Sequence, residues 1–246
     1  MRIRSFIIAY ALVLAILLFA DRRPGSTEQD RYSHVVDLTD GQNATSPHAT
    51  AEESRTRIIA PAALIPGTWA AGQIPPERLV APLVVMDLRT MDLGTMDLKT
   101  MDLNPAAEAV GDSPQISLDD IAAWESQHGM IPQGAVVAIR RTGAPQALST
   151  KDLSTTVPST TPFPVARDAA EFLIDARRTI GFAVETPVNL TSDRALGHQL
   201  ALHGSYVVEG TARFTSLPAT GSLIIVAPAK NKNPGEAPVR VLAMVR

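Results

Sequence analysis

The sequence predicts an α/β fold. Of its 246 residues, 45% are hydrophobic and 19% are charged, which gives room for one sizeable domain or two small ones. From Tyr32 onward, apolar runs alternate with amphipathic segments, a pattern typical of strands that alternate with helices. Runs of β-branched residues, such as 224–226, favour strands at the apolar segments.

The N-terminal segment, residues 1–20, predicts export or membrane anchoring. Arg2 and Arg4 precede an unbroken apolar run over 6–20, which matches a secretory signal peptide and is short for a membrane span. Leu18 and Ala20 only loosely match a cleavage site, so an uncleaved anchor is the alternative. Because residues 21–31 have the composition of a linker, a buried helix is disfavoured. We expect a periplasmic, secreted or N-terminally anchored protein.

We expect one domain over residues 32–246 that contains eight strands. Apolar and β-branched residues bounded by turn formers mark each of them. The expected strands cover residues 34–38, 57–61, 83–88, 135–140, 180–185, 205–209, 222–227 and 239–245.

Three helices are expected between these strands. Ser117 and Asp120 form a start like a capping box, and Gly129 is a natural stop for the same helix. The second helix covers about residues 166–178, with its apolar residues on one face. The third, over 193–203, is a weaker prediction because a glycine lies inside it.

A five-residue repeat, Met-Asp-Leu-x-Thr, occupies residues 86–104. Its period fits neither a strand nor a helix. The repeat resembles pentapeptide-repeat sequences, but its four copies would make a single coil, which is too small to bury a core. We therefore expect a short duplication inserted in the loop after the strand that ends near Leu88.

Charge and cysteine content exclude several classes of site. The net charge is −3 and the pI is about 6.0, whereas nucleic-acid binding usually requires a basic surface, so we expect no nucleic-acid partner. The chain has no cysteine, which excludes disulfides and thiolate ligands. Any metal must therefore be held by His, Asp or Glu.

Two segments carry a resemblance to a known family. The first is Arg-Thr-Arg-Ile-Ile-Ala-Pro-Ala at 55–62, and the second is Ile-Pro-Pro-Glu-Arg-Leu at 74–79. With blocks at 116–137, 141–143, 163–181 and 198–243, they resemble the cyclase family of metal-dependent hydrolases, which includes bacterial kynurenine formamidase (arylformamidase). The resemblance implies a swivelling β/β/α domain with a mixed sheet, assembled as a homo-oligomer.

The resemblance also implies a chemistry. Family members bind one or two divalent metals, zinc or manganese, and use a metal-activated water to hydrolyse a formamide or cyclic amide such as N-formylkynurenine, a step of tryptophan catabolism. The metal lowers the pKa of its bound water toward neutrality. The family's C-terminal His and Glu match His198 and Glu209, which implies that both are metal-binding and catalytic residues. The expected partner is a small molecule, with membrane contact only through residues 1–20.

Local sequence supports Glu209 more than the histidines. Glu209 ends an apolar strand, where a carboxylate is costly unless it has a partner. His203 is the alternative to His198, but a histidine before a glycine is typical of a helix C-terminus. His34, His48 and His128 are expected to be solvated.

The chain departs from the family at the metal motif. The segment H-x-G-T-H-x-D-x-P-x-H is absent, and Ala62 and Ala63 join its flanks directly. A further family histidine is replaced by Asp40. His198 and Glu209 are fewer ligands than catalytic zinc needs, which is about three. We therefore expect an impaired or inactive hydrolase. An active enzyme, a non-catalytic exported descendant with a ligand pocket, and a decaying gene product remain alternatives.

Overall fold

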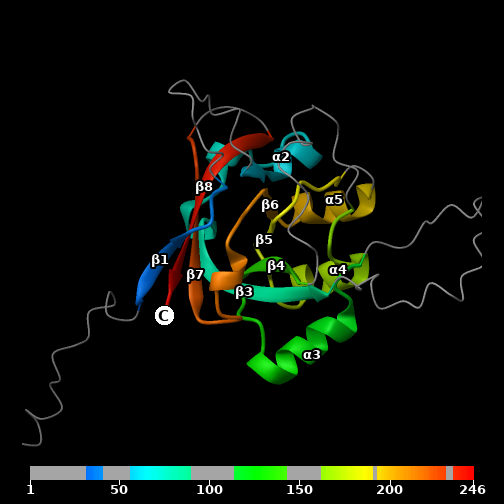
Figure 1. Cartoon of the computed structure of the whole chain (residues 1–246). Helices are drawn as coiled ribbons and strands as arrows, with labels where there is room; N and C mark the ends of the chain where they lie inside the picture. The colour runs from blue at the N-terminus through cyan, green and yellow to red at the C-terminus, as the bar shows by residue number, and fades with distance from the viewer. Residues whose placement is uncertain (1–31, 41–55, 90–113, 143–161, 191–192, 231–234) are drawn as a thin grey trace, which may run out of the picture.

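The structure is a computed structural model that describes residues 32–40, 56–89, 114–142, 162–190, 193–230 and 235–246 (Figure 1). Its strands are β1 (His34–Asp37), β2 (Arg57–Ile59), β3 (Val80–Arg89), β4 (Val136–Thr142), β5 (Gly181–Val184), β6 (Tyr206–Glu209), β7 (Ser222–Pro228) and β8 (Glu236–Val245). The α-helices are α2 (Pro61–Leu64), α3 (Leu118–His128), α4 (Arg167–Asp175) and α5 (Arg194–Leu202). Short 3-10 turns are η3 (Ala71–Gln73), η4 (Pro76–Arg78) and η5 (Phe214–Ser216).

The strands form one mixed sheet that closes on itself. β3, β4, β5 and β6 are neighbours and run parallel. The strand order is β1-β8-β2-β6-β5-β4-β3-β7, and because β7 also pairs with β8, the seven strands from β8 to β7 form a closed barrel. The predicted α/β fold with a mixed sheet is confirmed. The closure is an additional feature of the structure.

β1 and β2 follow one another along the same edge of β8. Asp37 lies opposite Leu242, whereas Arg57 lies opposite Pro238. The Thr56 hydroxyl between them accepts the Asp40 backbone N–H at 2.8 Å and donates to the Gly210 carbonyl at 2.7 Å. This buried hydroxyl therefore joins the end of β1, the start of β2 and the end of β6.

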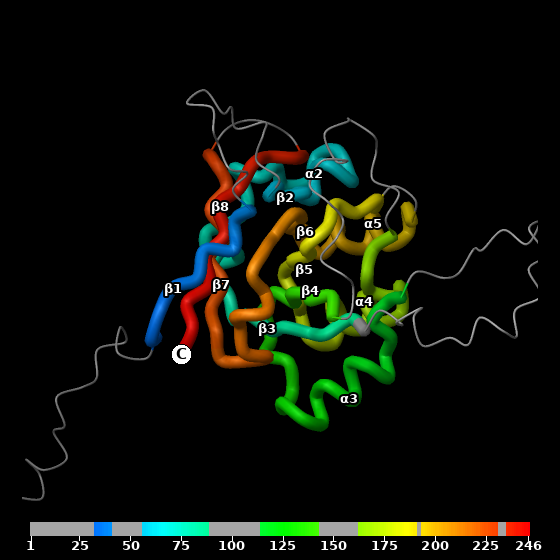
Figure 2. Tube along the Cα trace, in the orientation of Figure 1, coloured from blue at the N-terminus to red at the C-terminus, as the bar shows by residue number. Residues whose placement is uncertain are grey.

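Alternate side chains of the strands enter two separate cores. Ile58 and Val208 belong to the core inside the barrel, whereas Ile59 and Val207 belong to the core beneath the helices. In Figures 1 and 2, α3, α4 and α5 lie together on one side of the sheet, away from β1, β7 and β8. Burial of each large apolar side chain contributes about 1.5–3 kcal/mol, so both cores stabilise the barrel.

Side-chain caps and anchors fix the helices. Ser117 accepts the Asp120 N–H at 3.2 Å while the Asp120 carboxylate accepts the Ser117 N–H at 2.9 Å, so the predicted capping box at α3 is confirmed. Gly129 ends α3 with φ +86°, a conformation that favours glycine. The Trp124 indole N–H donates to the Val85 carbonyl at 2.9 Å, which ties α3 to β3.

Two sequence predictions need correction. The strand expected over 57–61 stops at Ile59, because Pro61 is the first residue of α2, where its fixed φ favours a helical turn. The repeat expected in a loop begins inside a strand, since Met86 and Asp87 belong to β3 and pair with β4. The later copies lie outside the described residues.

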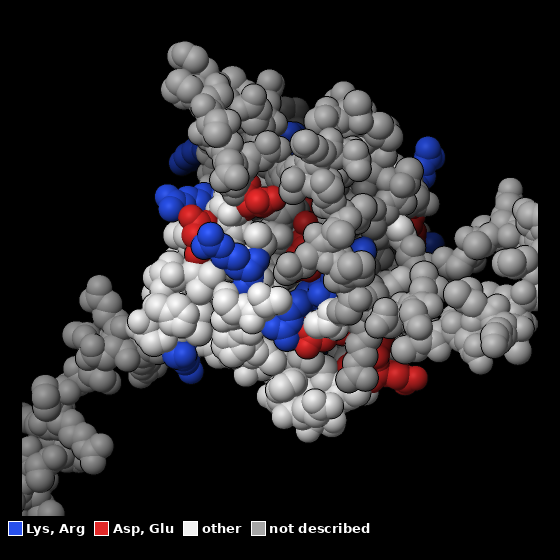
Figure 3. Space-filling model, viewed as in Figure 1, with Lys and Arg blue, Asp and Glu red and all other residues white. Residues whose placement is uncertain are grey.

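The expected N-terminal segment and linker, residues 1–31, also lie outside the described residues. Within the described part of the chain, no helix is long and apolar enough to span a bilayer. On the face drawn in Figure 3, acidic and basic side chains lie among one another.

Candidate functional site

The carboxyl ends of the parallel strands bring charged side chains to one edge of the barrel. Asp87 lies near the end of β3, Arg140 lies in the second half of β4, Glu185 follows β5, and Glu209 ends β6. In α/β sheets, ligands bind outside the carboxyl ends of parallel strands. This edge is therefore the first place to look for a site.

Glu209 is the most buried carboxylate of this edge, with a relative exposure of 9%. One of its oxygens accepts the backbone N–H of Val188 at 3.1 Å. Burial raises the pKa of Glu209, and Glu236 raises it further, whereas the Val188 hydrogen bond and the charge of Arg57 act in the opposite direction. The predicted site residue thus lies in a partly desolvated, charged environment.

Arg57 is the basic residue of that environment. It lies directly opposite Glu209 in the antiparallel β2–β6 pair, so both side chains are on the same face of the sheet. Its guanidinium lies 3.6 Å from Glu236. Its buried Nε–H has no hydrogen-bond partner among the residues that the structure describes.

His198 has a different setting. It lies on α5 with an exposed side chain, whereas its neighbours Leu196 and Leu200 are buried. No hydrogen bond or ion pair connects it to Glu209 in the described part of the chain. Metal binding or catalysis by His198 and Glu209 therefore stays a prediction, and a shared site would require His198 to act from the helix surface.

The other candidate residues have ordinary structural roles. His203 is the C-cap of α5, and its Nε2 lies 3.4 Å from Asp175, in agreement with the expected helix end. His34 and His128 are exposed, as expected, and His48 lies outside the described residues. Asp37 of β1 forms an ion pair with Arg240 of β8, with an N···O distance of 3.1 Å.

The junction that replaces the family motif forms the helical turn α2. The Ala62 N–H donates to the Trp69 carbonyl at 3.0 Å, and the Ala63 N–H donates to the Ala60 carbonyl at 2.9 Å. Gly235, with φ +106°, packs so closely on Ala63 that a Cβ at this glycine would lie 3.1 Å from the Ala63 Cα. α2 also contacts α5. The two flanks of the missing motif are therefore joined by a hydrogen-bonded turn with close packing.

The residues of this site do not fit a divalent metal. Among the described residues, no group of three or more His, Asp or Glu side chains could hold such an ion. The side chain opposite Glu209 in the β2–β6 pair is the Arg57 guanidinium, which is permanently positive and repels a cation. The family's metal chemistry is consequently not assigned to these residues.

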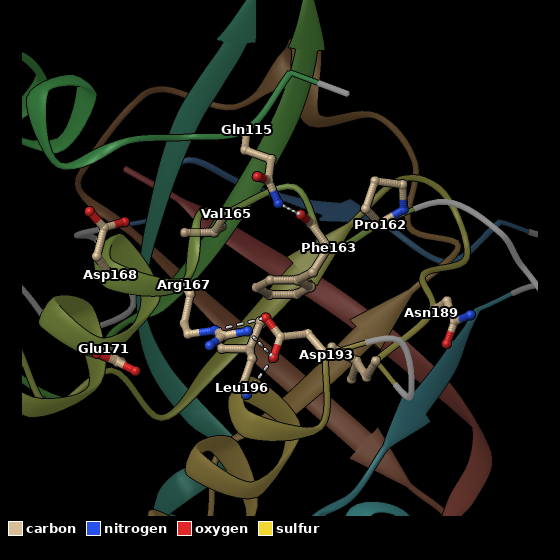
Figure 4. Close-up of a pocket in the computed structure, with 11 residues that line it drawn as sticks. Gln115, Pro162, Phe163, Val165, Arg167, Asp168, Glu171, Asn189, Asp193 and Leu196 are labelled. Carbon is tan, nitrogen blue, oxygen red and sulfur yellow. Dashed lines mark hydrogen bonds and ion pairs between the residues drawn. The ribbon is translucent and has the colours of Figure 1, made fainter. Parts of the chain in front are cut away.

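A cavity of about 530 Å³ opens beside the loop that follows β5. Val188, whose N–H binds Glu209, directly precedes Asn189 and Leu190 in the cavity wall. Figure 4 shows the lining residues, which come from the segment before α3, from the segments before and within α4, from this loop and from the start of α5. They are Gln115, Pro162, Phe163, Val165, Arg167, Asp168, Glu171, Asn189, Leu190, Asp193 and Leu196.

The cavity has an apolar floor and a charged rim. Phe163, Val165 and Leu196 are buried, whereas Arg167 and Glu171 are exposed. Arg167 and Asp193 form a bidentate pair, with N···O distances of 2.8 and 3.0 Å, across the space between α4 and α5 (Figure 4). Such a lining suits a small ligand with an aromatic or aliphatic body and polar edges.

Sequence reasoning missed Arg57, Glu236 and the cavity. The pairing of Arg57 with Glu209 and Glu236 depends on the strand order, and the cavity depends on how α4, α5 and the loop after β5 pack together. No local sequence pattern gives either arrangement. The sequence did contain one clue to Arg57. Successive residues of a strand face opposite sides, so the alternation of Arg57 with Ile58 indicates that Arg57 faces away from the core that holds Ile58.

Comparisons with known proteins agree with this fold. No curated protein matches the chain. Among solved structures, isatin hydrolase A from Labrenzia aggregata, bound to benzyl benzoate, is 25% identical with a TM-score of 0.58, over 86% of this chain and 93% of that chain. Isatin hydrolase A from Ralstonia solanacearum is 22% identical with a TM-score of 0.60, over 87% and 92%. A potential metal-dependent hydrolase with cyclase activity is 24% identical with a TM-score of 0.55, over 87% and 98%.

The family assignment rests on more than half of the chain. The model of the family described as "Putative cyclase" matches residues 24–189. The match includes both flanks of the Ala62–Ala63 junction, on which the resemblance was based. The chain belongs to this cyclase family and has a hydrolase fold similar to that of isatin hydrolases.

Proposed function

We propose that this chain is a cyclase-family protein that keeps a small-molecule pocket and in which hydrolysis of cyclic amides or formamides is impaired or absent. The observation that carries the proposal is the environment of Glu209, which faces Arg57 where a hydrolase of this family would need a metal. The Ala62–Ala63 turn supports it, because a hydrogen-bonded turn joins the two flanks directly where the family resemblance implies the metal-binding segment. The finer assignment of the fold to the swivelling β/β/α class is part of this proposal.

The ligand class follows from the pocket and from the relatives. Isatin hydrolases are named for isatin, a cyclic amide fused to an aromatic ring, and N-formylkynurenine is an aromatic formamide. The Phe163 ring in the pocket floor suits an aromatic body, while Asn189 and the charged rim suit amide and carboxylate groups. We therefore propose an aromatic amide or its hydrolysis product as the ligand.

A non-catalytic binding role is the second candidate. The described lining of the pocket includes neither Glu209 nor His198. A ligand in this pocket would contact the β5–α5 loop without touching either predicted catalytic residue. This separation favours binding without turnover.

Metal content and turnover test the loss of activity. The full chain should contain less than stoichiometric zinc or manganese, and it should hydrolyse isatin and N-formylkynurenine at the background rate with either metal added. Elemental analysis and absorbance assays measure these two quantities. Stoichiometric metal together with turnover that Glu209→Ala abolishes would contradict the proposal.

Substitution at the pocket rim tests the binding role. Glu171 is exposed, so Glu171→Trp should leave the fold intact while its indole fills the entrance. We expect isatin or isatinate to raise the melting temperature of the wild type and of Glu171→Ala, which keeps the entrance open, but not that of Glu171→Trp. Equal shifts in all three proteins would place binding elsewhere.

Export and assembly are also proposed. Residues 1–20 favour a periplasmic, secreted or N-terminally anchored protein, and family resemblance favours a homo-oligomer. Cell fractionation and size-exclusion chromatography with light scattering would test both. A cytosolic monomer would contradict them.

A further inference from the structure

Arg57 lies between two carboxylates on the helix-facing side of the barrel. β2 separates β6 from β8 in the sheet. Arg57 is opposite Glu209 of β6, and Ile59, two residues further along the same strand, is opposite Glu236 of β8. Residues two apart on a strand face the same way, so the three charged side chains are on one face.

The contacts agree with this placement. The Arg57 guanidinium lies 3.6 Å from a Glu236 oxygen, which is within ion-pair range. Glu209 is nearly buried and accepts one backbone N–H, from Val188, so its charge also needs a nearby cation. Arg57 is the basic residue that faces it across the β2–β6 pair.

A positive side chain between Glu209 and Glu236 affects whether these carboxylates can bind a metal ion. Divalent cations such as Ca²⁺ and Mg²⁺ bind carboxylate oxygens, and a positive side chain beside a carboxylate opposes that binding. A guanidinium keeps its proton at any physiological pH, so the repulsion that it exerts on a metal is permanent.

We propose that Arg57 is the resident cation of the Glu209–Glu236 pair, and that its guanidinium excludes a divalent metal from these carboxylates. The placement of Arg57 fits this role, because its guanidinium lies 3.6 Å from Glu236 while its strand position is directly opposite Glu209. This inference goes beyond the proposed function, since it names the residue that opposes metal binding.

Removing the charge of Arg57 tests the inference directly. The full chain is stripped with a chelator and titrated with zinc chloride by calorimetry. Arg57→Gln keeps a polar side chain that can donate hydrogen bonds and loses the charge, whereas Arg57→Lys keeps the charge. We expect zinc to bind Arg57→Gln at least tenfold more tightly than the wild type, and Arg57→Lys to behave like the wild type. The double variant Arg57→Gln with Glu209→Gln should return to wild-type affinity.

The possible outcomes separate cleanly. Equal zinc affinity in the wild type and Arg57→Gln would overturn the inference, and so would a gain that persists when Glu209 is also replaced. Zinc bound by the wild type at another site would contradict the proposed function, while a gain in Arg57→Gln that depends on Glu209 would still support the role of Arg57.

A stability measurement covers the case in which Arg57→Gln does not fold. Removing only the cation leaves a buried carboxylate unpaired, whereas removing both charges does not. The double variant should therefore fold and unfold at a denaturant concentration closer to that of the wild type. A double variant that is less stable than Arg57→Gln would show that Arg57 does not act through Glu209, and would overturn the inference.

Discussion

Two arginines of the barrel differ in how completely their contacts are made. Arg140 of β4 donates to both oxygens of Asp87, with an Nη2···Oδ2 distance of 2.9 Å, and to the Phe214 carbonyl at 3.1 Å. Arg57 of β2 lies 3.6 Å from Glu236, and its buried Nε–H has no hydrogen-bond partner in the described part of the chain. Both lie beside a carboxylate whose pKa is raised by burial, Glu185 in the first case and Glu209 in the second.

The difference indicates which of the two charges the fold depends on. Arg140 joins two parallel strands to the η5 turn, so its hydrogen bonds hold the barrel edge together. Among the described residues, Arg57 lies 3.6 Å from Glu236 and its Nε–H has no hydrogen-bond partner. The hydrogen bonds of Arg140 therefore connect more elements of the barrel than the contact of Arg57 with Glu236 does. We therefore explain the position of Arg57 by the carboxylate charges that it neutralises, those of Glu209 and Glu236.

The largest expected effect belongs to Arg140→Leu. This change leaves Asp87 and the Phe214 carbonyl without their donors, and we expect a loss of about 2–3 kcal/mol in the free energy of unfolding. Arg57→Gln should lose less than half as much. Urea unfolding followed by circular dichroism measures both values under the same conditions. If Arg57→Gln cost as much as Arg140→Leu, the contrast between the two arginines would be wrong.

Gly235→Ala tests the packing of the Ala62–Ala63 turn. Gly235 has φ +106°, and a Cβ there would lie 3.1 Å from the Ala63 Cα. Backbone strain and the close contact together should cost about 1–3 kcal/mol. Gly134→Ala is the matched control, because it also has positive φ but its Cβ would meet nothing within 4 Å. A loss no larger than that of the control would mean that the turn is not held by Gly235.

The elements of this fold could be predicted where the signal is local. Ser117, Asp120 and Gly129 mark both ends of α3 within the sequence itself, and β-branched runs mark the strands. The closure of β7 on β8 and the position of β2 between β6 and β8 are relations between distant segments, so no local pattern contains them.

Some features of the candidate site also have a local sequence signal, whereas others depend on contacts between distant segments. Glu209 could be predicted from its strand end and the family resemblance, and its burial agrees with the unusual context. The exposure of His198 could have been predicted from the helix pattern. Leu196 and Leu200 are four residues apart and share the buried face of α5, so His198, two residues from each, lies on the opposite face. Arg57 could not be connected with Glu209, since that requires the strand order.

The pH dependence of stability tests how strongly Arg140 stabilises the charge of the neighbouring Glu185. Burial raises the pKa of Glu185, whereas the Arg141 N–H and nearby arginines lower it by less. The folded state then binds the Glu185 proton more tightly than the unfolded state, whose pKa is about 4.3. Its contribution to stability is complete below that pH and is lost as the pH rises through the folded pKa.

Glu185→Gln removes this dependence and keeps an oxygen to accept the Arg141 N–H. Relative to the wild type, we expect the variant to gain stability over the pH range that begins at the unfolded-state pKa of about 4.3 and ends above the raised folded-state pKa. Thermal or urea unfolding across that range measures the change. A variant that loses stability relative to the wild type as the pH rises would show that Arg140 and Arg141 outweigh burial at Glu185.

Arg240→Ala provides the smallest effect and a reference for an exposed ion pair. Arg240 lies 3.1 Å from Asp37, with side-chain exposures of 69% and 39%, so water and salt screen the pair. We expect a loss of at most about 0.5 kcal/mol, and a smaller loss in 0.5 M salt. The stability loss of Arg240→Ala is the reference for Arg57→Gln, because Arg57 and Glu236 are also partly exposed, with side-chain exposures of 33% and 52%. If Arg57→Gln costs no more than Arg240→Ala but still increases zinc affinity, then Arg57 influences what the carboxylates bind without contributing to the stability of the barrel.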